Sequence, residues 1–182
     1  MSYRKVLRWT LIFIFISICP SLVYAKGYIE KNGDALQLLI PAVGLGSAIF
    51  YEQGNEGIVQ FSKAFAASQL FTESLKITIH KSRPNGDCCK SFPSGHTSAA
   101  FMGAGFIHKR YGWEYAVPAY IGATYVGYSR VQAHKHYVED VVAGALIGTL
   151  SSFYFTEQYN KGPSFVPIAG KDIHRINLSW SW

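Results

Sequence analysis

Residues 93–108, PSGHTSAAFMGAGFIH, predict a helix that other helices can approach closely. Ser94 is suited to cap the start of this helix, because its side-chain oxygen can accept a hydrogen bond from a free backbone N–H. The small residues that follow favour close helix packing: Ala99, Ala100, Gly103, Ala104 and Gly105. The stretch therefore favours a bundle of tightly packed helices.

Apolar segments on both sides of this stretch supply the other helices. We expect them over four ranges: 35–51, 58–81, 116–128 and 137–155. The second of these helices ends at the turn RPNGD (83–87), because proline disfavours helical geometry in the residue before it and Asn-Gly is a turn dipeptide. Residues 26–34 form a polar, glycine-containing lead-in. The predicted fold is all-α, an antiparallel helical bundle of about five to six helices, in one domain over residues 26–158.

The chain is poor in charge for its 182 residues. Hydrophobic residues make up 49% of it and charged residues only 15%, whereas a soluble domain usually carries about a quarter charged residues. We therefore favour membrane association, although the uncharged runs fall short of the roughly 20 residues of a transmembrane helix. A soluble secreted protein is the alternative. The net charge of +6 forms no basic block with interleaved aromatic residues, so no nucleic-acid partner is expected.

Residues 1–25 have the layout of a secretory signal. Arg4, Lys5 and Arg8 precede an apolar run, and Val23-Tyr24-Ala25 places small residues where signal peptidase reads them. We expect a signal peptide cleaved after Ala25, and the alternative is an uncleaved N-terminal anchor. In both cases the remainder is exported, either to the periplasm or to an inner membrane with a periplasm-facing active site.

The C-terminal tail, residues 159–182, differs from the rest of the chain. Its last residues alternate between apolar and polar side chains, which is the period of a β-strand. One or two strands cannot close a barrel, and open strand edges do not survive in lipid. We expect a short β-like hairpin that packs on the helical body or is loosely attached.

Three cationic residues are placed where they suit a phosphate group. Lys76 and Arg83 are seven residues apart, which is two turns of a helix, so both point the same way. Arg130 adds a third charge. Arginine offers phosphate oxygens a planar fork, and lysine offers a mobile point charge. Each alone is more often a solvated surface charge, but Lys76 interrupts an otherwise apolar helix.

A helix start and a His–Asp pair add reactive groups. Ser94 and Gly95 leave backbone N–H groups open to an anion at a helix N-terminus, with His96 in the first turn. His136 and Asp140 are four residues apart, so the carboxylate can accept a hydrogen bond from one ring nitrogen and leave the other free to attack. The alternatives are an ordinary serine cap and a surface His–Asp pair.

Metal and redox sites are both disfavoured. His134 and His136 lie near Asp140 in the sequence, but no third ligand follows at a usual spacing. We expect no metal and no other cofactor. Cys88 and Cys89 form neither a zinc pattern nor a disulfide framework, and we expect a free or intermittently oxidised pair in a loop.

Eleven residues between Lys76 and Asp140 stand in one order and spacing, K-x6-RP, PSGH and SR-x5-H-x3-D. This pattern resembles, without departure, the three-part signature of the type-2 phosphatidic acid phosphatase (PAP2) superfamily. The superfamily is related in its site to soluble class A acid phosphatases and vanadium haloperoxidases. The resemblance implies a bundle that gathers the three segments at one end, and a phosphatase that needs no metal.

The resemblance also implies a role for each residue. His136 is the nucleophile that forms a phosphohistidine, Asp140 orients it, and His96 acts first as general acid and then as general base. Five residues hold the phosphoryl oxygens: Lys76, Arg83, Ser94, Gly95 and Arg130. We expect the substrate to be a phosphate monoester or pyrophosphate of a membrane lipid. Undecaprenyl pyrophosphate, phosphatidic acid, phosphatidylglycerol phosphate and lipid A phosphates all stay open.

Three other functions fit parts of this pattern. A vanadium haloperoxidase would hold vanadate in the same site, but such enzymes are usually much longer, and nothing here indicates a halide pocket. A phosphotransferase would pass the phosphate to a lipid or sugar acceptor instead of water. A non-catalytic membrane scaffold is disfavoured, because the charges and histidines of all three segments are intact.

Overall fold

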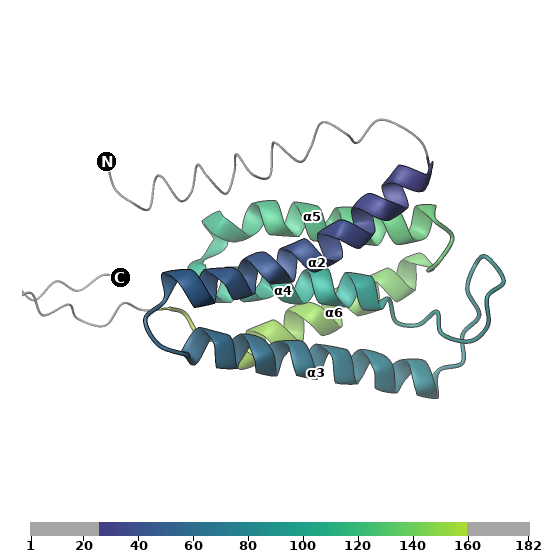
Figure 1. Cartoon of the computed structure of the whole chain (residues 1–182). Coiled ribbons are helices and arrows are strands. Elements are labelled where there is room, and N and C mark those ends of the chain that lie inside the picture. The colour runs from purple at the N-terminus through teal and green to yellow at the C-terminus, as the bar shows by residue number, and fades with distance from the viewer. Residues whose placement is uncertain (1–25, 160–182) are drawn as a thin grey trace, which may run out of the picture.

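The computed structural model describes residues 26–159, and these residues form five helices (Figure 1). The helices are α2 (Lys26–Tyr51), α3 (Glu56–Thr78), α4 (Gly95–Tyr111), α5 (Trp113–Gln132) and α6 (Val138–Phe155). Within the described part there is no β-strand. The prediction of an all-α bundle is therefore confirmed. The predicted signal peptide or anchor and the β-like tail from residue 160 onward lie outside the described residues.

The start of α2 differs from the prediction. The sequence predicts a polar lead-in over residues 26–34, but the helix begins at Lys26. Contacts with α5 explain the difference. The carbonyl of Glu30 accepts a hydrogen bond of 2.8 Å from Arg130, and Gly33 lies so close to Ser129 that any Cβ would overlap its hydroxyl. Tertiary contacts here override the weak helix propensity of the segment.

The end of α3 also departs from the prediction. The helix stops at Thr78, and Ile79 is extended, its N–H donating to the carbonyl of Leu75. Arg83 therefore lies in the turn that follows the helix. Lys76 and Arg83 do not share a helix face over two turns, so that prediction is wrong, and the loop after α3 decides how close the two charges lie.

α4 forms the centre of the bundle, because it contacts each of the other described helices. Its small residues make this possible. A Cβ at Gly103 would lie 2.7 Å from the backbone nitrogen of Pro41 in α2, and Gly148 of α6 lies against the carbonyl of Ser98. Glycine leaves room for this approach of two backbones. The close packing predicted for residues 94–108 is confirmed.

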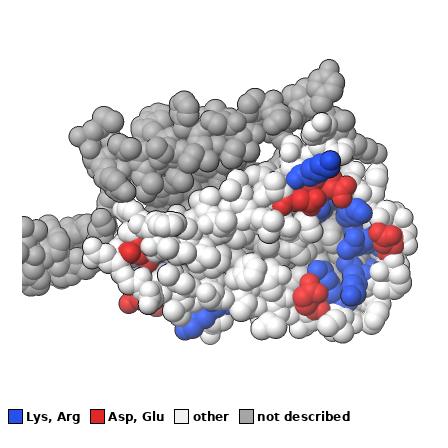
Figure 2. Space-filling view, in the orientation of Figure 1, with Lys and Arg blue, Asp and Glu red and all other residues white. Residues whose placement is uncertain are grey.

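Charged residues gather at one end of the bundle. Consecutive helices run antiparallel, so α2, α4 and α6 begin at the end where α3 and α5 finish (Figure 1). Figure 2 shows acidic and basic side chains together at this end, next to a largely uncharged middle. At the other end, Arg110 donates to Glu52 over 2.8 Å, and both side chains are buried. All three predicted segments lie at the first end.

Two described helices are long and apolar enough to cross a membrane, Gly27–Tyr51 and Val138–Phe155. Large apolar side chains also point outward from α3 and α6. They include Leu70, Phe71, Ile77, Val142, Leu146 and Leu150. The sides of the bundle are therefore apolar, whereas its charged end is polar.

Candidate active site

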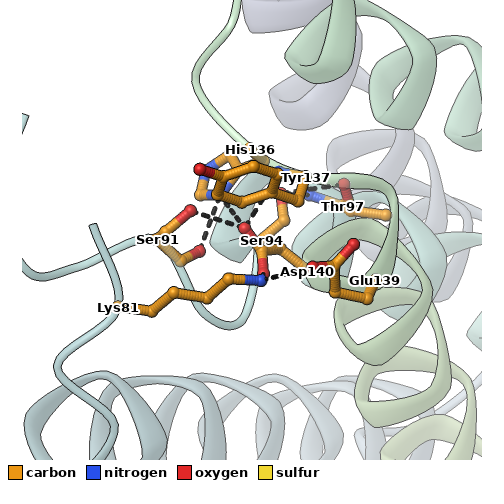
Figure 3. Close-up of polar contacts among 8 residues, drawn as sticks. All are labelled: Lys81, Ser91, Ser94, Thr97, His136, Tyr137, Glu139 and Asp140. Carbon is orange, nitrogen blue, oxygen red and sulfur yellow. Dashed lines mark hydrogen bonds and ion pairs between the residues drawn. The ribbon is translucent and has the colours of Figure 1, made fainter. Parts of the chain in front are cut away.

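His136 is the best-fixed reactive group at the charged end. It lies between α5 and α6, is 4% exposed, and its Nδ1 is 2.7 Å from the backbone carbonyl of Ser91 (Figure 3). A carbonyl oxygen can only accept, so Nδ1 carries the proton and donates it. This fixes the tautomer and leaves Nε2 with a lone pair. His136 is thus prepared to act as a nucleophile through Nε2.

Asp140 supports His136 less directly than the sequence predicts. Its carboxylate Oδ2 is 3.7 Å from the Nδ1 of His136, which is too long for a hydrogen bond. The reason is that Oδ2 is already occupied. It accepts from the hydroxyl of Ser91 and from the backbone N–H of Tyr137 at the start of α6. The predicted direct hydrogen bond between Asp140 and His136 is wrong, and Ser91 stands between them.

Lys81 completes the surroundings of Asp140. Its Nζ lies 2.7 Å from Oδ1 of Asp140 and 2.7 Å from Oε1 of Glu139. In Figure 3 the Lys81 side chain reaches from the loop after α3 to the first turn of α6. Asp140 is completely buried, and a buried carboxylate is stable only when paired or hydrogen-bonded. Lys81 supplies that pairing.

The start of α4 follows the predicted pattern in part. The buried hydroxyl of Ser94 accepts from the N–H of Thr97 and pairs with the Thr97 hydroxyl at 2.9 Å, so it caps the helix. A Cβ at Gly95 would lie 2.9 Å from the Nζ of Lys76. The absence of a side chain at Gly95 therefore lets the Lys76 ammonium approach the N-terminus of α4, where the backbone N–H groups favour an anion.

His96 and Arg130 share one acidic partner. Asp34 of α2 places its Oδ1 2.8 Å from Nη1 of Arg130 and 3.1 Å from Nε2 of His96. Arg130 is nearly buried, and its Nη2 donates to the carbonyl of Glu30. Asp34 of α2 therefore contacts both the start of α4, at His96, and the end of α5, at Arg130. The sequence gives no signal for it, because it lies far outside the three segments.

The remaining cations lie close enough to act on the two imidazoles. Burial lowers the pKa of both imidazoles, and the charge of Arg83 adds to this effect at His136, as the charges of Arg130 and Lys76 do at His96. Lys76 also pairs with Glu73 on α3 at 2.8 Å. The fold thus brings Lys76, Arg83 and Arg130 to the end of the bundle that holds both histidines, with Arg83 placed there by the loop after α3.

A groove of about 580 Å³ leads away from the site between α2 and α3. At one end it is lined by His96, Lys76 and Gly95, and further along by apolar side chains. The apolar lining includes Leu38, Pro41, Ala42, Leu45, Phe61 and Phe65. One continuous surface therefore joins a charged, histidine-bearing end, which carries both Lys76 and Glu73, to a largely apolar channel.

The described residues hold no metal-binding cluster, and the cysteine pair lies apart from the site. Among residues 26–159, no group of three His, Cys, Asp or Glu side chains is arranged to hold a metal ion. Cys88 and Cys89 are bonded to each other in the loop that joins Arg83 to Ser91. Both cysteines lie outside the contacts that surround His136.

Comparisons with known proteins point to one superfamily. Residues 57–163 match the model of the PAP2 superfamily. The chain is 31% identical over 171 residues to a lipid A 4'-phosphatase of Helicobacter pylori, and the match covers 85% of each protein. It is 39% identical over 79 residues to a lipid A 1-phosphatase of Porphyromonas gingivalis, a match that covers 41% of this chain and 18% of that protein.

Two solved structures have a similar fold. The crystal structure of Aquifex aeolicus LpxE matches with a TM-score of 0.60 at 22% identity, over 79% of this chain and 93% of that one. A transmembrane PAP2-type phosphatidylglycerolphosphate phosphatase from Bacillus subtilis matches with a TM-score of 0.53 at 23% identity, over 81% and 93%. These two structures show the fold, and the family match and the H. pylori relative show that this chain is a hydrolase acting on phosphoric esters and belongs to the PAP2 superfamily.

Proposed function

We propose that this protein hydrolyses a phosphate monoester of a membrane lipid by way of a phosphohistidine on His136. The observation that carries the proposal is the groove between α2 and α3, which joins His96 and Lys76 to an apolar channel. A lipid phosphate has the same division, with an anionic head on an apolar tail. The relatives named lipid A phosphatases support the same class of substrate.

The first step transfers the phosphoryl group to the protein. Nε2 of His136 attacks phosphorus, and the bond from phosphorus to the ester oxygen breaks with its electron pair on that oxygen. His96 gives its proton to the departing alkoxide. The Ser91 carbonyl holds the Nδ1 proton of His136, so the charge that develops on the imidazole forms next to an acceptor and near the Asp140 carboxylate.

The second step releases phosphate. His96, now neutral, takes a proton from a water molecule that attacks the phosphohistidine. The phosphorus–nitrogen bond breaks, its electron pair returns to Nε2 of His136, and inorganic phosphate leaves. His96 is then protonated again for the next turnover. Lys76, Arg83 and Arg130 balance the charge on the phosphoryl oxygens, and the α4 N-terminus at Ser94 and Gly95 adds backbone N–H groups.

We further propose that the bundle lies in a membrane with its charged end at the outer surface. The apolar candidate spans in α2 and α6 and the outward-facing apolar residues of α3 support this placement. A lipid could then reach the groove from the side while its headgroup stays at the polar end. Export of the chain with α2 starting on the outer side puts the site on the periplasmic face.

Phosphate release from a lipid panel tests the proposed function. Wild type and His136→Ala are compared on phosphatidic acid, phosphatidylglycerol phosphate, undecaprenyl pyrophosphate, lipid A phosphates and soluble phosphate esters. We expect release from at least one lipid phosphate by wild type alone. Release from soluble esters but from none of the lipids would contradict the lipid assignment, and no release from any substrate would contradict the phosphatase assignment for this chain.

The groove predicts a dependence on acyl-chain length. Each buried CH₂ contributes about 0.8 kcal/mol, so kcat/KM is expected to rise with chain length until the groove is filled. Ala42→Phe narrows the groove and should lower kcat/KM for a long-chain lipid phosphate about tenfold, while p-nitrophenyl phosphate hydrolysis stays unchanged. Ala66→Phe, on an exposed part of α3 outside the groove lining, is the matched control. Equal losses in both variants would rule out the groove as the lipid site.

The two histidines predict an acidic pH optimum. Burial lowers the pKa of His136 to about 4, helped by Arg83 and opposed by the Ser91 hydrogen bond and Asp140. His136 attacks as the neutral base, so the reactive fraction grows as pH rises through about 4. Burial and Arg130 also lower the pKa of His96, and Asp34 opposes them. His96 must carry a proton, so its reactive fraction falls as pH rises through a value below about 6.5.

For a soluble alkyl phosphate, whose leaving group needs the proton of His96, the expected profile of kcat/KM is therefore a bell with its maximum between these two limits. The measurement is kcat/KM from pH 3.5 to 8, for wild type and His96→Gln. The variant should lose the decline on the alkaline side. A wild-type kcat/KM that still climbs between pH 6.5 and 8 would contradict the assignment of His96 as the acid.

A further inference from the structure

Lys81 makes a contact that none of the three sequence segments predicts. It lies among the variable positions between Lys76 and Arg83, in the extended stretch after α3. Its Nζ is 2.7 Å from Asp140 and 2.7 Å from Glu139. Glu139 is exposed, whereas Asp140 is completely buried, so the contact with Asp140 is the one whose carboxylate is shielded from water.

The network around Asp140 leads from Lys81 to the reactive imidazole. Lys81 holds Oδ1 of the carboxylate, and Ser91 donates its hydroxyl to Oδ2. The carbonyl of the same Ser91 accepts the Nδ1 proton of His136. The backbones of these two residues are also joined directly, because the N–H of Ser91 donates to the carbonyl of Lys81 over 2.9 Å. Lys81 precedes the Cys88–Cys89 loop and Ser91 follows it, and these hydrogen bonds hold the two residues together.

We propose that Lys81 is a positioning residue for His136, which acts by neutralising Asp140 and so holding the Ser91 carbonyl against the imidazole. This inference rests on the proposed function, since it concerns the same reaction. Without the ammonium group, the buried carboxylate would lose its partner, and breaking a buried ion pair from one side is strongly destabilising to the local arrangement. Ser91 would then no longer be held in place by a fixed acceptor.

The surroundings of Lys81 distinguish this role from phosphate binding. Two carboxylates occupy its ammonium, which also lies 4.4 Å from the centre of the Tyr137 ring. Burial alone would lower the pKa of Lys81, but the hydrogen bonds that its ammonium donates to Asp140 and Glu139 outweigh burial and raise the pKa. Lys81 therefore stays charged across the pH range of the reaction, and it is not among the residues that line the groove.

A double-mutant cycle tests the proposal in the full-length protein. Lys81→Met keeps most of the side-chain length but removes the charge, and we expect kcat to fall on the order of 10²-fold with KM nearly unchanged, the cost of a misplaced reactive group. Lys81→Arg should recover at least about tenfold, because a guanidinium can reach both carboxylates. In an Asp140→Asn background, Lys81→Met should cost little more, since residues in one network are not additive.

Three results would overturn the proposal. A KM that rises while kcat is unchanged would make Lys81 a substrate ligand. Additive effects of the two substitutions would separate Lys81 from Asp140, and a Lys81→Arg enzyme no better than Lys81→Met would exclude a role of the charge. Lys109→Met, an exposed lysine near the end of α4 at the opposite end of the bundle, is the matched control and should behave as wild type.

Two further measurements keep the test independent of folding and of turnover. If Lys81→Met aggregates, Ser91→Ala takes its place and should lower kcat about tenfold at constant KM, by analogy with other orienting partners. Histidine-selective ¹⁵N spectra, assigned with His136→Ala, should show an Nδ1-protonated ring in wild type and a mixture of tautomers in Lys81→Met. The same tautomer in both proteins would refute the positioning role. Wild type that releases no phosphate would instead refute the proposed function.

Discussion

His136→Ala is expected to lower phosphate release by about 10⁴-fold or more, with the affinity for inorganic phosphate nearly retained. This loss of activity is typical of enzymes whose nucleophile has been removed, because only substrate binding and electrostatic stabilisation then remain. In this protein the cations and the groove do not depend on the imidazole, so substrate should still bind. The measurement is kcat from steady-state phosphate release, together with the Kd for inorganic phosphate from calorimetry.

A neighbouring histidine provides the control. His134 lies in the same loop but is exposed, and His134→Ala should leave kcat within a factor of about two. The nucleophile assignment would be contradicted if His136→Ala retained more than about a hundredth of wild-type kcat, or if both variants lost activity equally.

His96→Gln is expected to give the second largest loss, about 10²- to 10⁴-fold on an alkyl phosphate, which is the usual contribution of a general acid. The loss should depend on the leaving group. An alkoxide needs the proton of His96, whereas p-nitrophenolate leaves without it, so formation of the phosphohistidine from p-nitrophenyl phosphate should be much less impaired. Its hydrolysis should stay slow, because the same residue activates water.

Burst kinetics separate these two steps. With p-nitrophenyl phosphate, His96→Gln should release close to one equivalent of p-nitrophenolate rapidly and then turn over slowly. His80→Gln, an exposed histidine just beyond α3, should show wild-type kinetics. An equal loss on alkyl and aryl esters, without a burst, would show that His96 is not the acid.

Much of the site could be predicted because its residues lie next to helix ends. The run 94–108 contains a cap and a row of small residues, and these alone fix where α4 begins and how closely its neighbours approach. Since α4 starts where α3 and α5 finish, the segments around Lys76, Ser94 and Arg130 had to meet. The family resemblance agrees with that geometry and adds the roles of the residues.

The contacts of Asp34 and Ser91 could not be predicted, because no local sequence pattern indicates them. Asp34 reaches Arg130 and His96 only because α2 extends to Lys26 and packs on α5, and nothing in a polar, glycine-containing segment indicates this. Ser91 takes the place expected of Asp140 through its backbone carbonyl, a group that every residue has. Spacing can show which side chains are near one another along a helix, but it does not show which oxygen a ring nitrogen will meet.

The most direct test of the account is to identify where phosphate is bound during turnover. The His96→Gln protein is mixed with ³²P-labelled p-nitrophenyl phosphate, quenched in base within the burst, digested and analysed by mass spectrometry. We predict a phosphohistidine on the peptide that contains His136, and none in the His136→Ala/His96→Gln double variant. Rapid release of p-nitrophenolate with no label on the protein, or label on a different residue, would contradict the nucleophilic role of His136.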